Sequence, residues 1–533
     1  MNRVVSRMAS FVVKQWPRLL AFFGLFIAFT TCFHQAQSLG MRDRMPGWVV
    51  DAVPPAVAQA LPVQAKRYTI PLDLKDLFQG VGHDSASLNA RIRTAMERKH
   101  PASGSGYVLL GNDDKGIVDF VSIAFRVFGY RAQSIFDLYF FVLAISLVLL
   151  AIAFPGNAHA LTMAGSLVLT LSVVIPSFAF NGQVTSLLAP RVFPALSMVA
   201  CLHCLLAVWS PSPDRRVLVT AAIQLALIFL VVHLRSTAAW QVTIIALSAL
   251  FVIILSRREI SQQSASAKRR FPSGAIVLLV GIVAGVLTLQ VWRHVAYPDD
   301  YRRGDQILTR VFWHNIYSGL AFSDVIRERE SLRIDDVSVI RATGRYLVSE
   351  GRDEEWAGVG GLTDNFSGIR WAPYDDVVRQ MLSHTCKTLL YECLVEAPKQ
   401  KLLALGGTLA WLFGIISEPP RLELFSSVDV GDTVRAQVLE ATRMLDERGQ
   451  RRSPLTWRVL VVLLAFLSFA LVSRSQFPVM PGLCLALGSL IPTLAGYPAA
   501  HAVAEPALAA GLLLHGLVFL VVLRLIQGGM KPP

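Results

Sequence analysis

The chain of 533 residues is 53% hydrophobic and only 16% charged, and its formal net charge is +13. Soluble domains carry charge on about a quarter of their residues, so this composition excludes a soluble multidomain protein. The basic residues occur in short clusters beside apolar runs and not along one polar face, which argues against nucleic-acid binding.

The apolar residues gather in uninterrupted runs, such as 217–234 and 274–291. As helices, these runs are long enough to cross a hydrocarbon layer of about 30 Å. The first run, 19–33, follows Arg3, Arg7, Lys14 and Arg18 and lacks a clear small-x-small cleavage site after it. We therefore interpret it as an uncleaved signal anchor.

Lysine and arginine concentrate on cytoplasmic loops, so the N-terminal cluster and the basic run between Arg257 and Arg270 should both lie inside. This rule places the first seven spans near 19–35, 136–154, 159–178, 191–209, 216–234, 239–255 and 273–292. The final spans are expected near 457–473, 479–497 and 506–525. The short run 402–416 fits either an interfacial helix, which we favour, or a further crossing.

The chain is therefore predicted to be an all-α polytopic membrane protein with about 10–11 transmembrane helices and two large non-cytoplasmic loops that contain amphipathic helices. We expect it in the plasma (inner) membrane, with its active face outside the cytoplasm. The expected parts are the tail and first span (1–35), the first outer loop (36–134), spans two to seven (135–292), the second outer loop (293–400), the interfacial or crossing helix with a polar segment (401–453) and the C-terminal spans (454–533).

The first outer loop ends in an acidic turn, Asp113-Asp114, followed by a predicted amphipathic helix over 117–128 that Gly129 would end. Asp119, Ser122 and Arg126 form its polar side, and the helix is expected to lie on the outer membrane surface. One carboxylate of the pair could act as a general base for a hydroxyl. Taken alone, the two residues fit better an Asx turn with a helix cap, where aspartate is favoured for backbone reasons.

Arg191 and Arg235 are basic residues on the outer side, where the charge rule disfavours them. Both precede spans whose N-termini face outward, so helix dipoles and free amides would add to each guanidinium and favour a phosphate. Snorkelling to lipid headgroups is the competing explanation. His233, one turn inside Arg235, fits a buried polar residue paired with a neighbour.

In the second outer loop, Trp313 and His314 offer an aromatic surface and a titratable ring that suit a sugar or a headgroup, or they pack the loop. The six cysteines show no metal-ligand spacing. Cys386 and Cys393 would lie about 10 Å apart on one straight helix, too far for a disulfide.

A first span, a long outer loop, and Asp113-Asp114 leading into a helix that ends at Phe128-Gly129 resemble the GT-C membrane glycosyltransferases, such as protein O-mannosyltransferases and aminoarabinose transferases. The resemblance implies that Asp113 or Asp114 is the catalytic base and that Arg191 and Arg235 hold the donor phosphate. It also implies a polyprenyl-phosphate-linked sugar donor and a hydroxyl acceptor on a glycan, lipid or protein.

Three other functions stay open: a transporter or flippase, an O-antigen polymerase or ligase, and a scaffold without catalysis. A transporter should show intramembrane charges or paired broken helices, and few such charges occur in the spans. The sequence indicates no cofactor and no metal site, although sugar transfer of this kind is compatible with a divalent ion.

Overall fold

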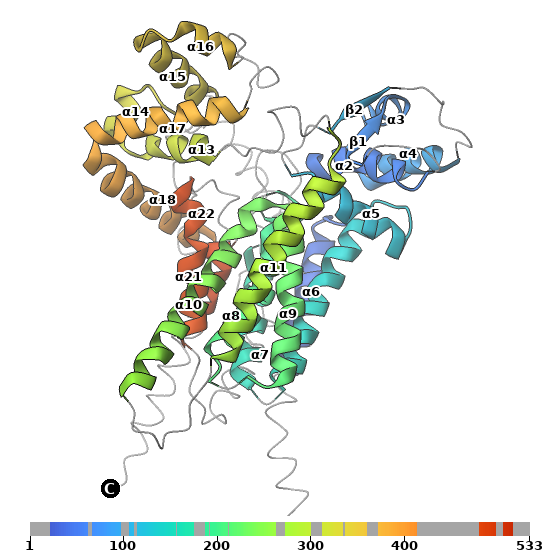
Figure 1. Ribbon diagram of the computed structural model, residues 1–533. Helices are drawn as coiled ribbons and strands as arrows, with labels where there is room; N and C mark the ends of the chain where they lie inside the picture. The colour runs from blue at the N-terminus through green and yellow to red at the C-terminus, as the bar shows by residue number, and fades with distance from the viewer. Residues whose placement is uncertain are drawn as a thin grey trace, which may run out of the picture.

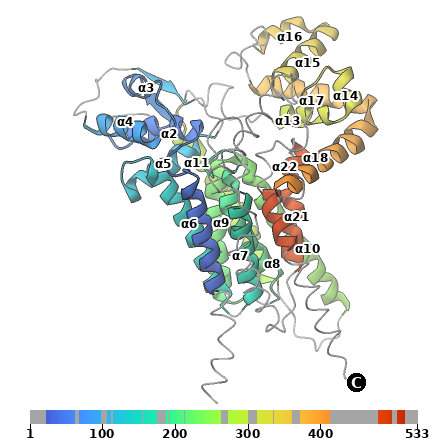
Figure 2. The ribbon, with the colours of Figure 1, turned by 180° about the vertical axis from the view of Figure 1, so that it is seen from behind.

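A computed structural model describes residues 22–61, 67–97, 106–110, 114–155, 157–174, 187–190, 192–211, 213–262, 272–299, 312–333, 336–359, 371–412, 479–496 and 505–514. These residues are almost entirely helical, which confirms the all-α class. They form a helical bundle with two lobes, both at the same end of the bundle (Figure 1 and Figure 2).

Within the described residues, four helices of the bundle are long and apolar enough to cross a membrane by length and composition. They are α6 (Gln133–Ala153), α9 (Arg215–Leu234), the segment Ser236–Ser256 and α11 (Ser273–Ala296), and they coincide with the expected spans two, five, six and seven. The segment Ser236–Ser256 consists of a 3-10 turn (Ser236–Ala238) and most of α10 (Ala239–Gln262). The rest of the described bundle comprises the helix over 22–38, α7 (Ala158–Val174), a 3-10 turn (Phe193–Ser197) with α8 (Met198–Trp209), α21 (Val479–Ser489), α22 (Ile491–Ala495) and the helix Glu505–Leu514.

The first lobe is the described part of residues 39–131, and it caps α9 and α11. It contains α2 (Gly47–Ala58), β1 (Thr69–Pro71), α3 (Leu72–Phe78), α4 (Ser85–Glu97), β2 (Tyr107–Leu109) and α5 (Gly116–Phe128). The two strands pair antiparallel, with Ile70 opposite Val108. Strands of three residues are too short to show an alternating pattern, so the sequence did not predict them.

The second lobe is the described part of residues 312–412, and it has a hydrophobic core of its own. It contains α13 (Phe312–Ser318), a 3-10 turn (Gly319–Phe322), α14 (Asp324–Arg329), α15 (Asp336–Ser349), α16 (Asp353–Gly358), α17 (Trp371–Thr388), a π-helical turn (Glu392–Glu396) and α18 (Ala397–Leu412). Asp375 accepts hydrogen bonds from the backbone amides at the start of α13, including that of His314 at 3.0 Å. The acidic side chain thereby joins α17 to α13.

The separation of about 10 Å predicted for one straight helix does not apply, because Cys386 and Cys393 form a disulfide with a Cα–Cα distance of 5.7 Å. The two residues do not share a straight helix. The helix α17 ends at Thr388, a bend follows at Leu389, and Cys393 lies in the π-helical turn Glu392–Glu396.

Candidate functional site

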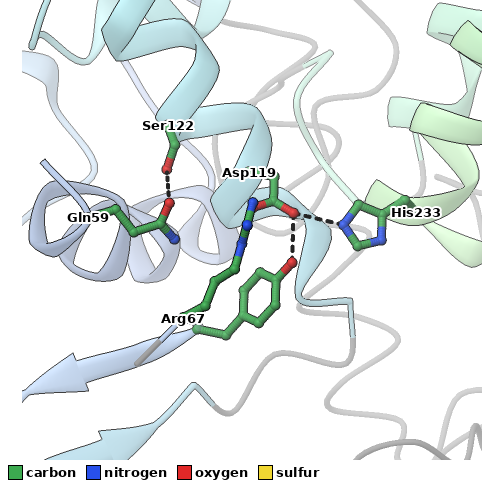
Figure 3. Close-up of polar contacts among 6 residues, drawn as sticks. Gln59, Arg67, Asp119, Ser122 and His233 are labelled. Carbon is green, nitrogen blue, oxygen red and sulfur yellow. Dashed lines mark hydrogen bonds and ion pairs between the residues drawn. The ribbon is translucent and has the colours of Figure 1, made fainter. Parts of the chain in front are cut away.

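The carboxylate of Asp119, in the first turn of α5, accepts hydrogen bonds from three side chains (Figure 3). Arg67 donates to Oδ1 from Nε at 3.1 Å and from Nη2 at 2.7 Å. The other oxygen, Oδ2, accepts from the Tyr68 hydroxyl at 2.7 Å and lies 2.8 Å from Nε2 of His233. The segment before β1, the helix α5 and the bundle helix α9 are thus joined through this carboxylate, whose side chain is 8% exposed.

A glycine permits this meeting. The N-terminal residue of α5, Gly116, packs directly against the C-terminal turn of α9, and a Cβ atom there would overlap the backbone carbonyl oxygen of His233. At the other end of α5, Gly129 ends the helix with a φ of 91°, as its position in the sequence predicted. The two glycines fix where α5 begins and ends, and with it the direction of Asp119.

The charges in this cluster stabilise one another. Burial pushes the pKa of Asp119 upward, but hydrogen bonds from His233 and Arg67 outweigh it and hold that pKa below its usual range. Burial and the adjacent Asp119 carboxylate raise the pKa of Tyr68, so its hydroxyl keeps the proton that it donates. Asp119 is therefore an ionised acceptor at neutral pH.

Arg67 is held from a second side by an aromatic ring. Its guanidinium carbon lies 4.3 Å from the ring centre of Trp292, near the C-terminal end of α11. A cation over an indole face is a favourable contact, worth about 0.5–1 kcal/mol where solvent reaches it. The first lobe is thus fastened to α9 through Asp119 and to α11 through Arg67.

Beside this cluster, the structure has a groove of about 580 Å³ between α5, α9 and α11. One end is polar and is lined by Gln59, Arg67, Asp119, Ser122, Arg126 and His233. The walls are almost wholly apolar and come from Ala222, Leu225, Ala226, Phe229 and Leu230 of α9 and from Val277, Leu278, Gly281, Ala284, Gly285, Thr288, Leu289 and Trp292 of α11. The distribution of polar and apolar residues along the groove therefore matches an amphipathic ligand with one polar head.

The groove is open along the side of the bundle, because Ala226 of α9 and Ala284 of α11 are both exposed. Two glycines of α11 bring the walls together: a Cβ at Gly281 would crowd Leu225, and one at Gly285 would overlap the ring of Phe229. From Val277 to Trp292, α11 rises about 22 Å at 1.5 Å per residue. A long apolar chain can lie along this wall.

At the polar end, Arg126 is a cation with no ion pair to any described residue, whereas Arg67 is paired with Asp119. The Ser122 hydroxyl, one turn before Arg126, donates to Oε1 of Gln59 at 3.1 Å. The polar side of α5 that the sequence predicted thus lines the groove, and Asp119 and Ser122 are buried.

The structure brings together two of the predicted site residues, Asp114 and Arg235. Nη1 of Arg235 lies 2.7 Å from Oδ2 of Asp114, and the backbone amide of Ser236 lies 3.4 Å from Oδ1. The two side chains are 2% and 17% exposed, and neither lines the groove. Asp114 thus neutralises Arg235 and reaches the start of the 3-10 turn before α10, while the N-cap of α5 itself is Lys115.

The other predicted residues are placed as follows. Asp113 and Arg191 lie outside the described residues. Trp313 is half-buried against the core of the second lobe, and His314 is 3% exposed, with Nδ1 at 2.9 Å from the Tyr374 hydroxyl. Neither of these two residues lines the groove.

Sequence reasoning missed Arg67 and Tyr68 and gave Asp119 no role. The pair just before β1 carries no motif. The usable signals were a polar side on an otherwise apolar helix and His233 at a span end, which was expected to pair with an unnamed neighbour. The structure shows that this neighbour is Asp119. No sequence pattern joins positions so far apart.

Within the described residues, no group of three or more histidine, cysteine, aspartate or glutamate side chains could hold a metal ion. Compared with known proteins, the chain matches no family model, no curated protein and no solved structure.

Proposed function

We propose that the chain is a GT-C-like membrane glycosyltransferase, which moves a sugar from a polyprenyl-phosphate carrier to a hydroxyl of a glycan, lipid or protein. In this proposal the chain crosses the plasma membrane about ten times, and both lobes lie on its outer face. The disulfide Cys386–Cys393 supports the outer placement of the second lobe, because disulfides persist in oxidising compartments.

One observation carries the proposal: the groove joins an apolar wall along two membrane helices to a polar end with the cation of Arg126, which pairs with no described residue. A polyprenyl phosphate has matching parts, a long hydrocarbon chain and an anionic head. The hydrocarbon chain of the lipid would lie between α9 and α11, and its phosphate would contact the guanidinium groups of Arg126 and Arg67. Asp114 and Arg235 neutralise each other and so support the architecture beside the groove.

Binding of undecaprenyl phosphate to the purified protein in nanodiscs tests this assignment. Ala284→Trp would fill the groove, whereas Val283→Trp, next to it on α11 and 60% exposed, would place the same side chain on the surface of the bundle. We expect at least a tenfold loss of binding for the first variant and none for the second. Equal binding by both would contradict the proposal.

Arg126→Gln isolates the contact with the anion. The change removes a charge that forms no ion pair with a described residue, so the stability of the protein should be kept. Undecaprenyl phosphate should bind roughly tenfold more weakly. Undecaprenol, which lacks the phosphate, should bind equally to the wild type and the variant. A similar loss for both lipids would show that Arg126 only shapes the groove.

A further inference from the structure

The imidazole of His233 has one nitrogen engaged and one free of partners. Nε2 faces Asp119, while Nδ1 is buried and has no hydrogen-bond partner among the described residues. The residue is only 7% exposed, yet it lines the groove at its polar end. A buried polar atom without a partner costs about 1–3 kcal/mol, so its retention beside a groove favours a role toward a bound molecule.

The protons around Asp119 fix the tautomer of this ring. An ionised carboxylate only accepts hydrogen bonds, and Arg67 and Tyr68 donate to it as well. In the neutral form of the ring, the contact at 2.8 Å therefore requires the proton to sit on Nε2. Nδ1 then carries a lone pair.

We propose that His233 is the catalytic base of the transfer and that Asp119 is its positioning residue; this rests on the function proposed above. Nδ1 takes the proton of the acceptor hydroxyl as its oxygen forms a bond to the anomeric carbon of the sugar. The bond between that carbon and the phosphate oxygen breaks, and the polyprenyl phosphate leaves with the electron pair. Asp119 stabilises the imidazolium, which then releases its proton to solvent.

The neighbouring carboxylates are less suited to this step. Both oxygens of Asp119 are already occupied by donors, and accepting a proton there would weaken its contacts with Arg67 and His233. Asp114 is 3% exposed, pairs with Arg235 and does not line the groove. Among these three groups, only His233 both lines the groove and has a nitrogen without a hydrogen-bond partner among the described residues.

A substitution can separate the two nitrogens of the ring. In His233→Gln the amide nitrogen can still donate to Asp119, so the structural contact is kept while the basic nitrogen is lost. The probes are undecaprenyl phosphates that carry glucose, mannose, galactose or aminoarabinose, with water and envelope glycolipids as hydroxyl acceptors. We expect kcat to fall about 100-fold or more, with KM for the lipid and undecaprenyl phosphate binding unchanged.

His203→Gln is the matched control, because His203 is also buried in the bundle and contacts the Thr220 hydroxyl, but it lies outside the groove. It should keep at least half of the wild-type kcat. In His233→Ala, added imidazole should restore activity, which repair of a purely structural contact would not do. A His233→Gln variant that keeps kcat within threefold would overturn the assignment.

A spectroscopic readout needs no turnover. Nitrogen-15 NMR of histidine-labelled protein in liposomes, with the signals assigned by their loss in His233→Gln, should show the tautomer protonated at Nε2. Protonation at Nδ1 would overturn the proposal directly. If the wild type binds no undecaprenyl phosphate, the glycosyltransferase function fails and this role fails with it, whereas normal binding with an indifferent Gln variant refutes the base alone.

Discussion

The two lobes are built on different principles, although they lie at the same end of the bundle (Figure 1). Buried residues of the first lobe, such as Tyr68 and Phe120, belong to one continuous core with the bundle. Most of those of the second lobe, such as Tyr317 and Tyr374, form a separate core, whereas Leu405 of α18 packs into the core of the bundle. The first lobe therefore cannot be removed without opening the bundle, while the second has the organisation of an independent unit.

The ion pairs differ in the same way. In the first lobe, Asp119 and Asp114 pair with His233 and Arg235, more than a hundred residues away. In the second lobe, several pairs are local, such as Arg352 with Glu355 three residues on. Local exposed pairs contribute little to stability, whereas buried long-range pairs fix geometry. The candidate site therefore lies at the seam between the first lobe and the bundle, where the buried long-range pairs are.

The largest expected effect comes from Asp119→Asn, which tests that seam. The substitution removes the charge that Arg67 faces and presents a donor where three donors already converge. We expect a loss of about 3 kcal/mol in the free energy of unfolding, followed as thermal unfolding in detergent, together with loss of undecaprenyl phosphate binding.

Asp376→Asn is the control in the second lobe, because Asp376 forms an exposed pair with Arg379 at 3.4 Å. It should change stability by less than about 0.5 kcal/mol. If the two variants unfold at the same temperature, the seam has no special weight and the comparison of the lobes fails.

The next effect is steric. In Gly116→Ala, the new methyl group meets the backbone carbonyl of His233, which a side-chain movement cannot relieve. We expect about 1–3 kcal/mol of destabilisation and weaker docking of α5 on α9, measured by hydrogen exchange of both helices. Gly358→Ala in the second lobe meets nothing within 4 Å and should be neutral or stabilising. Unchanged exchange in the Gly116 variant would contradict the close contact.

A smaller and local effect is expected from the disulfide. Replacing Cys386 and Cys393 by serine removes a short loop constraint, for which chain entropy gives about 2 kcal/mol. The loss should appear in the exchange rates of α17 and α18, while the groove binds undecaprenyl phosphate as before. Weaker binding would show that the second lobe supports the groove after all.

The sequence predicted the parts of this molecule that depend on local patterns. Apolar runs gave the spans at α6, α9 and α11, and the amphipathic pattern with Gly129 gave α5. The pairing of Arg67 with Asp119 depends on how a loop returns to a helix, which no local pattern encodes. The disulfide was missed for a related reason, because its geometry depends on a helix irregularity after Thr388.

The sequence came close to the site without identifying its groups. Asp114 and Arg235 were selected separately, as base and phosphate ligand, and the structure shows that they neutralise each other. Two oppositely charged residues that are each predicted to bind a different ligand can instead pair with each other. Here the packing of α5 on α9 brings the two residues together. The polar side of α5 was predicted, but the helix was expected to lie on the outer membrane surface. In the structure, that polar side lines the groove.

The smallest expected effect is a difference in acid response between the lobes. The pKa of Asp119 is lowered in the folded protein, so its contribution to stability is present above the unfolded pKa of about 3.9 and is lost as pH falls below it. The pKa of Asp375 is raised by burial, which outweighs the backbone amides that it binds. Its ionised form is disfavoured on folding, so the second lobe gains stability as pH falls through that raised pKa.

Hydrogen exchange between pH 7 and pH 3, corrected for the intrinsic rate, measures both responses in one sample. Protection of α5 should fall below about pH 4, while protection of α13 and α17 should hold or rise. Asp375→Asn should flatten the second response and leave the first, since the two carboxylates belong to separate cores. A parallel loss of protection in both lobes would mean that acid unfolds the molecule as one cooperative unit, and the independence of the second lobe would then be refuted.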